Sequence, residues 1–319
     1  MDELSRRNLV TIAAITMAST VAFAGASLVS TACAADFPTR PITLVVPYPA
    51  GGGVDAMARV VAQKLSDAFR QTVTVDNRGG GGGTIGTRAV ARAAPDGYTL
   101  LLGHTGTLSI NPSLYTSIGM DPRKDFAPIG LVASMPVALL AHPSFPAKTV
   151  AELIALARKA PGTLNIGTSP VGTGGYMCAE LFKAEAGIDI AIIHVPVAFG
   201  VLPPALGNIT AGQLRAVAVT SKTRFSLLPD VPTFDESGLP GFEAVLHYGL
   251  LAPHGTAPEI VDILSAVLRK LGNDPEVQKR IRLEGGDPLS STPAEYADDI
   301  DREEKKWSKL VHQLGLKVE

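Results

Sequence analysis

Three glycine-rich segments of the sequence have the residue types to bind an anion. They span residues 49–55, 77–86 and 167–175, and each joins a strand-like run to a helical pattern. The first amides of a helix have no partner within the helix, and the peptide dipoles add partial positive charge at that end. A carboxylate or a phosphate is therefore a suitable ligand. Glycine also serves tight turns, so one loop would mean little, but three loops in one chain favour an anion pocket.

Two side chains near these loops could add to such a pocket. Asp55 stands in the first turn of the helix that follows the first loop. There it either complements the helix dipole or accepts a hydrogen bond from a ligand hydroxyl or amine. His104 follows a predicted strand at its carboxyl end, the edge at which α/β sheets form pockets. An ordinary surface histidine is the alternative interpretation.

No pattern in the sequence favours catalysis. Residues 81–86 satisfy the G-x-G-x-x-G spacing, but a dinucleotide site needs an acidic residue about 20 positions further on. Gly103 and His104 stand there instead. The Walker lysine, G-x-S-x-G and H-E-x-x-H motifs are missing from the sequence, and its six histidines show no metal-ligand spacing. The sequence therefore predicts no catalytic residue, no metal and no cofactor, with a nucleotide-dependent oxidoreductase as the alternative.

The composition bounds the class of partner. The chain has 319 residues, 28 of them basic and 30 acidic, which gives a net charge of −2. Without a basic block there is no electrostatic footprint for a nucleic acid. The 32 glycines and 24 prolines, with 5% aromatic residues, indicate many turns between short elements rather than long bundles. We therefore expect no nucleic-acid partner and a small ligand.

The N-terminal segment is typical of an export signal. Arg6 and Arg7 precede an apolar run at 9–29, which ends in small residues suited to a signal peptidase. We interpret residues 1–34 as a signal peptide cleaved near Ala34, with a membrane anchor as the alternative and the export route, general or twin-arginine, left open. Cleavage would leave a single cysteine and therefore no intrachain disulfide.

Strand-like and helical patterns alternate along the rest of the chain, which predicts α/β architecture with parallel sheets covered by helices. Capping-box patterns mark three helix starts, at Thr149, Thr256 and Thr292. Three further helices are expected, from residue 54, over 84–94 and over 176–185. The expected strands span 42–46, 73–75, 99–102, 129–132, 137–141, 164–166, 190–194 and 214–219.

Several blocks in combination resemble one known family. They cover almost the whole mature chain, and they span residues 40–42, 47–52, 75–79, 94–101, 111–115, 229–233, 236–238, 248–253 and 292–295, together with Asp55. These blocks are similar to the Bug family, the periplasmic solute receptors of tripartite tricarboxylate transporters.

The resemblance implies a two-domain, periplasmic-binding-protein-like α/β fold, in which each domain is a sheet flanked by helices and two hinge crossings join the domains. Residues 35–134 and 250–319 would form domain I, and 135–249 domain II, with crossings near 134–137 and 246–250. It also implies a periplasmic receptor, monomeric and not an enzyme. The receptor would close on a small carboxylate and deliver it to the membrane subunits of a tripartite tricarboxylate transporter.

The pocket that the resemblance implies uses the loop after the first strand, the loop around His104 and the helix start of the second domain. The expected ligand-binding residues are Tyr48, Ala50, Gly51, Gly52, Asp55, His104, Thr105, Ser109, Thr168, Ser169, Gly172, Thr173 and Gly174.

The sequence departs from the family pattern after Pro196. Members continue there with an aromatic-basic-glycine turn and a helix, whereas here Pro196 runs directly into the apolar residues 197–201. A parallel crossover needs about a dozen residues or more. Either the two apolar runs merge into one longer strand, or domain II, shortened after Pro196, is damaged. A degenerate member that folds poorly and binds nothing is therefore a further alternative. Gly200 also stands where relatives often have an acidic residue, which disfavours an amino-acid ligand.

Overall fold

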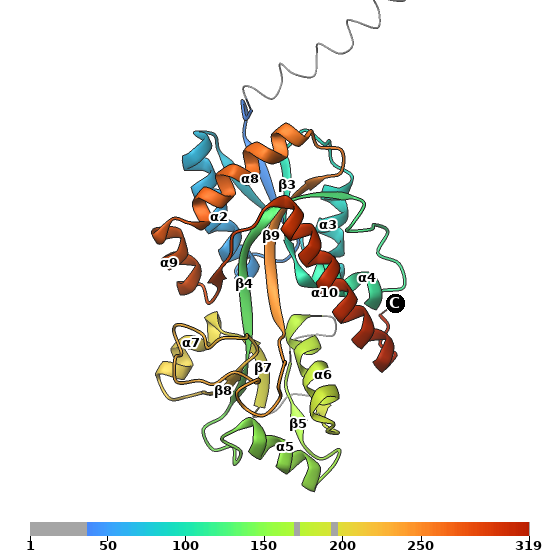
Figure 1. The fold of residues 1–319 in the computed structure, drawn as a ribbon, viewed down its shortest axis with the longest axis vertical. Helices are drawn as coiled ribbons and strands as arrows, with labels where there is room; N and C mark the ends of the chain where they lie inside the picture. Colours follow the sequence, from blue (N-terminus) through green and yellow to red (C-terminus); the bar gives the residue numbers. More distant parts are fainter. Residues whose placement is uncertain (1–36, 169–172, 193–196, 319) are drawn as a thin grey trace, which may run out of the picture. The chain divides into compact units, whose positions relative to one another are not determined.

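The computed structural model describes residues 37–168, 173–192 and 197–318 (Figure 1). From Arg40 onwards the chain forms one unit by its contacts, so the predicted division into two domains stays a prediction. The elements in chain order are β1 (Ile42–Val46), α2 (Gly53–Phe69), β2 (Val73–Asn77), a 3-10 turn (Gly81–Gly83), α3 (Thr84–Ala91), β3 (Thr99–His104), a π-helical segment (Gly106–Ile110), α4 (Asn111–Leu114), β4 (Phe126–Ala141), α5 (Val150–Lys159), β5 (Asn165–Ile166), α6 (Gly174–Ala186), β6 (Ala191–Ile192), β7 (Val197–Val201), α7 (Pro203–Thr210), β8 (Arg215–Val219), β9 (Val245–Pro253), α8 (Pro258–Gly272), α9 (Pro275–Leu283), β10 (Asp287–Pro288) and α10 (Pro293–Leu314).

Three parallel strands begin the main sheet. β1 lies between β2 and β3 and is parallel to both. Four of its five residues are apolar, as is typical of a parallel strand whose two faces are covered by helices. Val45 and Leu101 pack with Val90 of α3 and Tyr296 of α10 in one buried cluster. The carboxyl ends of β1 and β3 therefore reach the same edge of the sheet, where the first glycine loop and His104 follow.

The long strands β4 and β9 are antiparallel to each other and continue this sheet (Figure 1). The order is β10-β4-β9-β3-β1-β2, with β7 and β8 paired to the last five residues of β4. The sequence predicted two strands, at 129–132 and 137–141, and parallel sheets. Both predictions are wrong here, because β4 is one strand of 16 residues and only β1, β2 and β3 are parallel in this sheet. Pro128 and Pro136 divide the apolar pattern, but they lie within the strand, next to register shifts or changes of partner.

The short strands β5, β6 and β7 show what replaces the expected crossover. β6 pairs with β5 in parallel, and Gly167, directly after β5, makes a parallel bridge to Ala198 of β7. Ala191 donates to the carbonyl of Leu164, whereas Gly167 bonds to Val197 and Phe199. Successive residues along a strand direct their backbone N–H and C=O groups to opposite edges of that strand. β6 and β7 are therefore separate strands on opposite edges of β5, so the expectation of one merged strand is wrong.

The register explains how the chain can reach β7. Ile192 pairs with Ile166, and Ala198 bridges to Gly167, the next residue. β7 therefore begins at the level of the sheet at which β6 ends. No return along the strand is needed, and such a return is what makes an ordinary parallel crossover long. Residues 193–196, which join the two strands, lie outside the described residues.

Helix ends test the capping patterns. Thr149 accepts from the Glu152 amide, and Thr292 and Glu295 form a full capping box, so these two starts are confirmed. The start at Thr256 is wrong: α8 begins at Pro258 with Ala257 at its N-cap, because proline favours the first helical position. α3 ends at Ala91, three residues before the expected end.

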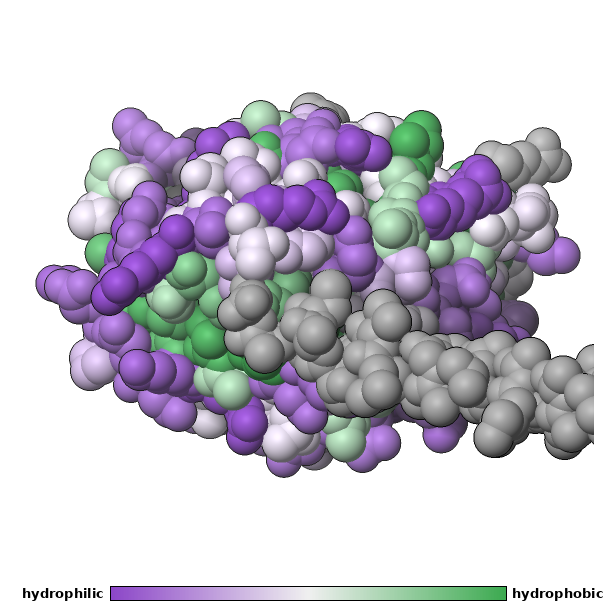
Figure 2. Space-filling view, turned by 90° about the horizontal axis from the view of Figure 1, so that it is seen from above, coloured by the Kyte–Doolittle hydropathy of each residue, from purple (hydrophilic) through white to green (hydrophobic). Residues whose placement is uncertain are grey.

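The described residues bury most of their large apolar side chains. Figure 2 shows a face on which hydrophilic residues cover much of the surface around one hydrophobic area. Across the described residues, the exposed large hydrophobic side chains are Ile85, Leu227, Leu283 and Leu314. None of the helices in this part of the chain is long and apolar enough to cross a membrane.

Candidate functional site

Two helix N-termini lie over one pair of side chains on the long strands. Met135 of β4 is paired directly with Leu246 of β9, and directly opposite residues of antiparallel strands project from the same face. A Cβ placed on Gly53, at the start of α2, would lie 3.9 Å from Met135 Cε. A Cβ on Gly174, at the start of α6, would lie 2.5 Å from Leu246 Cδ1. The first residues of both helices therefore lie against the same face of the β4–β9 pair.

The first glycine loop is built to leave its backbone open. Gly51 has a φ of +88°, which disfavours any side chain. Gly52, the N-cap of α2, has extended backbone and no side-chain cap. Ala50, Gly51 and Gly52 are exposed. The loop therefore leaves its backbone accessible to solvent at a positive helix end.

Asp55 braces this loop from inside. Its carboxylate is 4% exposed and accepts from the Gly51 amide at 2.9 Å and from Arg59 Nε at 3.0 Å. Burial opposes ionisation, but hydrogen bonds from Arg59 and Gly51 outweigh it, and the pKa of Asp55 is lowered. The carboxylate thus fixes the loop and neutralises the nearby guanidinium.

His104 lies in an aromatic cluster at the end of β3. It is 5% exposed, so the alternative of an ordinary surface histidine is wrong. Its Nδ1 accepts from the Gly106 amide at 2.8 Å and lies 3.3 Å from the Tyr48 hydroxyl. The ring stacks on Tyr248 and meets Tyr48 edge-on, both with centroids 5.2 Å apart. Burial lowers the pKa of His104 to about 4, so the ring is neutral at pH 7.

The second glycine segment supports the first loop. Gly80, Gly81, Gly82 and Gly83 all have positive φ. A Cβ on Gly83 would lie 3.2 Å from the Pro47 carbonyl oxygen. These glycines therefore allow a close approach of two backbone segments.

Two asparagines connect these loops. Asn77 Nδ2 donates to the Tyr48 carbonyl at 3.1 Å, and Asn111 Nδ2 donates to the Gly82 carbonyl at 2.9 Å. Sequence reasoning named neither asparagine, nor Tyr248, as a candidate. These three residues lie within the sequence blocks that resemble the family, and no other pattern in the sequence marks them. Their role depends on contacts between segments that are far apart in the sequence.

Thr105 and Ser109 are directed into the protein. The His247 amide donates to Thr105 Oγ1 at 2.7 Å, and Thr105 is 3% exposed. Ser109 lies in the π-helical segment, is 2% exposed, and its hydroxyl donates to the Ile300 carbonyl of α10 at 3.4 Å. Thr105 therefore links the His104 loop to β9, and Ser109 links it to α10.

At the start of α6, the described residues include three of the expected ones. Thr168 is partly buried, Thr173 is the N-cap with extended backbone, and Gly174 is buried. Ser169 and Gly172 lie outside the described residues.

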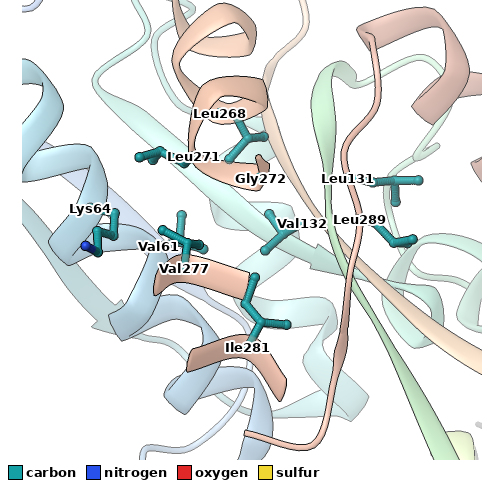
Figure 3. Close-up of a pocket in the computed structure, with 10 residues that line it drawn as sticks. All are labelled: Val61, Lys64, Leu131, Val132, Leu268, Leu271, Gly272, Val277, Ile281 and Leu289. Atoms are coloured by element: carbon teal, nitrogen blue, oxygen red, sulfur yellow. The ribbon is translucent and has the colours of Figure 1, made fainter. Parts of the chain in front are cut away.

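Other candidate sites give no chemistry. An apolar cavity between α2, α8, α9 and β4 has one charged lining residue, Lys64, whose ammonium lies 3.5 Å from Glu276 (Figure 3). Cys178 is buried, and burial raises its pKa to about 12, which suits a core residue and not a nucleophile. Within the described ranges, no three His, Cys, Asp or Glu side chains cluster to hold a metal.

The burial of His104 predicts a loss of stability in mild acid. The unfolded chain takes up a proton near pH 6.5, while the folded ring resists it down to about pH 4. Stability is therefore fully present above pH 6.5 and falls as the pH drops from 6.5 towards 4. We expect about 2 kcal/mol less unfolding free energy from this group at pH 4.5 than at pH 7. Urea unfolding of the wild type and His104→Gln at both pH values measures it, and equal pH dependence in the two proteins would contradict it.

Comparison with known proteins places this arrangement in a family. The family described as "Tripartite tricarboxylate transporter family receptor" matches residues 57–198 and 192–316. The two matched stretches overlap at residues 192–198, at the junction of β6 and β7.

Relatives and solved structures agree with this match. Protein BugT of Bordetella pertussis is 33% identical over 311 residues, covering 92% of this chain and 95% of BugT. The structure described as "R. palustris Rpa4515 with adipate" is 32% identical, with a TM-score of 0.81, over 88% of this chain and 100% of that one. MatC of Rhodopseudomonas palustris with bound malate is 30% identical, with a TM-score of 0.76, over 86% and 100%. This chain therefore belongs to the family of tripartite tricarboxylate transporter receptors and has their periplasmic-binding-protein-like α/β fold.

Proposed function

We propose that this protein is a periplasmic receptor that captures a small carboxylate and delivers it to the membrane subunits of a tripartite tricarboxylate transporter. The convergence of the α2 and α6 N-termini on Met135 and Leu246 carries the proposal. Amides at a helix N-terminus bind a carboxylate through charge-assisted hydrogen bonds. Such bonds specify the carboxylate and leave the rest of the ligand free.

The known relatives support this ligand class. Two solved structures of about the same identity are described with adipate and with malate, both small dicarboxylates. At the α2 loop the guanidinium of Arg59 is already paired with Asp55. Backbone amides are therefore the donors that we expect to hold the carboxylate.

In this proposal, residues 35–134 with 250–319 and residues 135–249 form the two domains, and β4 and β9 are the crossings. Ligand binding shifts the population from an open to a closed arrangement. Residues 1–34 act as the export signal, and the mature protein works as a monomer without catalysis.

The second domain would be a shortened one. Two observations support this: the overlap of the two matched stretches at residues 192–198, and the register in which β7 begins where β6 ends. The shortening would remove a crossover segment while the order β6-β5-β7-β4-β8 is kept.

A thermal melt tests the function. We expect one cooperative transition of the mature protein, shifted upwards by one or more acids of a panel that contains succinate, malate, adipate, citrate and benzoate. A ligand at a hundred times its Kd adds about 2.7 kcal/mol to stability, which moves the Tm by several degrees. A transition that no acid moves would contradict the proposed ligand class. A broad transition would favour the degenerate, non-binding member.

The variant Gly52→Val connects that shift to the loop. Gly52 has extended backbone, and a Cβ there meets only the Pro49 carbonyl oxygen, at 3.9 Å. Valine should therefore fold normally while its branches cover the first amides of α2. We expect an unchanged Tm without ligand and at least a tenfold weaker Kd. Gly51→Val would be a poorer test, because its φ of +88° strains any side chain.

A further inference from the structure

We propose that His104 determines ligand selectivity at this site: its Nε2–H donates to an oxygen acceptor of the bound acid and excludes an ammonium group from the same place. The inference rests on the function proposed above. The amides of the helix N-termini cannot distinguish between such ligands, and the proposal assigns this selectivity to one neutral side chain.

The contacts of the ring determine which nitrogen carries its proton. Nδ1 accepts from the Gly106 amide at 2.8 Å, and the Tyr48 hydroxyl lies 3.3 Å away. A proton on Nδ1 would point at the amide hydrogen of Gly106. The neutral ring therefore holds its proton on Nε2, where it can only donate.

Nε2 is available to a ligand. It makes no hydrogen bond within the described residues. It is also not one of the fully buried polar atoms without a partner, which are Asp55 Oδ1, Arg215 Nε, Ser265 Oγ and Tyr296 Oη. The small exposed part of His104, 5%, is consistent with an open Nε2 edge.

The ring also lies on the correct face of the sheet. His104 pairs with Tyr248 of β9, and the two rings stack. Leu246 is two residues from Tyr248 along the strand and projects from the same face. Gly174, at the start of α6, lies against Leu246. The Nε2–H donor and the α6 amides therefore share one face.

The ring cannot turn to reverse its donor and acceptor. Tyr248 stacks on it and Tyr48 closes its edge. A Cβ on Gly106 would lie only 2.7 Å from Cε1 and Nδ1, so the backbone follows the ring closely. The direction of the Nε2–H is thus fixed before a ligand arrives, which lowers the ordering cost of binding.

The aromatic side chains that contact the ring in the described part of the chain are uncharged. Tyr48 and Tyr248 contact it, and burial raises the pKa of both phenols. His247, between Leu246 and Tyr248 on β9, projects from the opposite face and pairs with Asp299 of α10. An oxygen with a free lone pair suits a neutral donor, whereas an ammonium group offers only hydrogens. Carboxylate, carbonyl and hydroxyl groups are therefore accepted, without proton uptake.

Calorimetry with matched ligands tests the selectivity. L-malate and L-aspartate share one skeleton and differ by a hydroxyl against an ammonium group, as do 2-hydroxyadipate and 2-aminoadipate. We expect the wild type to prefer each hydroxy acid at least tenfold. The variant His104→Gln, whose amide nitrogen replaces Nε2, should keep the hydroxy-acid Kd within about threefold, whereas His104→Asn, which reproduces only Nδ1, should weaken it at least tenfold. Equal affinities for hydroxy and amino acids, or for the two variants, would overturn the proposal.

Nitrogen-15 NMR of histidine-labelled protein gives a readout that needs no ligand. His104→Gln identifies the His104 signals, and at pH 7 we expect the pattern of the Nε2–H tautomer. A protonated ring or an Nδ1–H tautomer would overturn the inference. If no acid binds the wild type, the proposed function fails and the assigned selectivity fails with it. The NMR spectrum then shows separately whether Nε2 of His104 carries the proton.

Discussion

Substitution of Gly174 by valine is expected to abolish carboxylate binding and to destabilise the protein by about 1–3 kcal/mol, because it overpacks a buried contact. Gly174 is the first residue of α6, and a Cβ there would lie 2.5 Å from Leu246 Cδ1. Valine must therefore push the helix N-terminus away from β9. The amides of α6 would then leave the face on which they meet those of α2.

A double-mutant cycle identifies the cause of this effect. Leu246→Ala removes the side chain that valine would strike, at a cost of its own of about 2–5 kcal/mol. In that background Gly174→Val should cost much less stability and less affinity than in the wild type. Urea unfolding and calorimetry with malate and adipate measure both. Additive effects of the two substitutions would show that the contact between α6 and β9 is not what positions the amides.

The second large effect is expected at Thr220, which ties both long strands together. Its Oγ1 accepts from the Val137 amide of β4 at 2.9 Å and donates to the carbonyl of Ala244, just before β9, at 2.6 Å. Thr220 is fully buried. Thr220→Val keeps the shape but removes the acceptor of the Val137 amide and the hydroxyl donor to the Ala244 carbonyl. That carbonyl then keeps only the Cys178 thiol, a weak donor at 3.6 Å. A buried group left without its hydrogen bond costs about 1–3 kcal/mol.

We therefore expect Thr220→Val to lower the free energy of unfolding by about 2–4 kcal/mol. Thr220→Ser is the matched control, because it keeps the hydroxyl and removes only a methyl group. It should cost about 1 kcal/mol. If valine destabilises no more than serine, the hydroxyl contributes no more than the methyl group and is not the main link between the two strands.

Local patterns predicted the parts of the fold that local forces decide. β1, α2 and the caps at Thr149 and Thr292 follow from apolar spacing and from the chemistry of the N-cap. The glycine loop at 49–55 was located for the same reason, since a helix N-terminus is visible in sequence.

Long-range pairing determines the features that local sequence patterns did not predict. The two prolines of β4 look like breaks, yet pairing with β9 on one side and with β7 and β8 further along keeps the strand continuous. His104 could have been a surface residue, and only the stacking of Tyr248 and the edge of Tyr48 show that it is buried. Thr105 and Ser109 have polar side chains of the expected type, but β9 and α10 take their hydroxyls.

The continuity of β4 has a mechanical consequence for the closing motion proposed above. β4 and β9 run side by side through the junction, paired at Met135–Leu246 and Pro136–Val245. A paired ribbon bends little in its plane but twists readily about its axis. Rotation of one half against the other would therefore be spread as torsion over many residues instead of being absorbed at one flexible joint. In that motion the ribbon would act as a torsion spring, which would store elastic energy on closing and return that energy when the solute leaves.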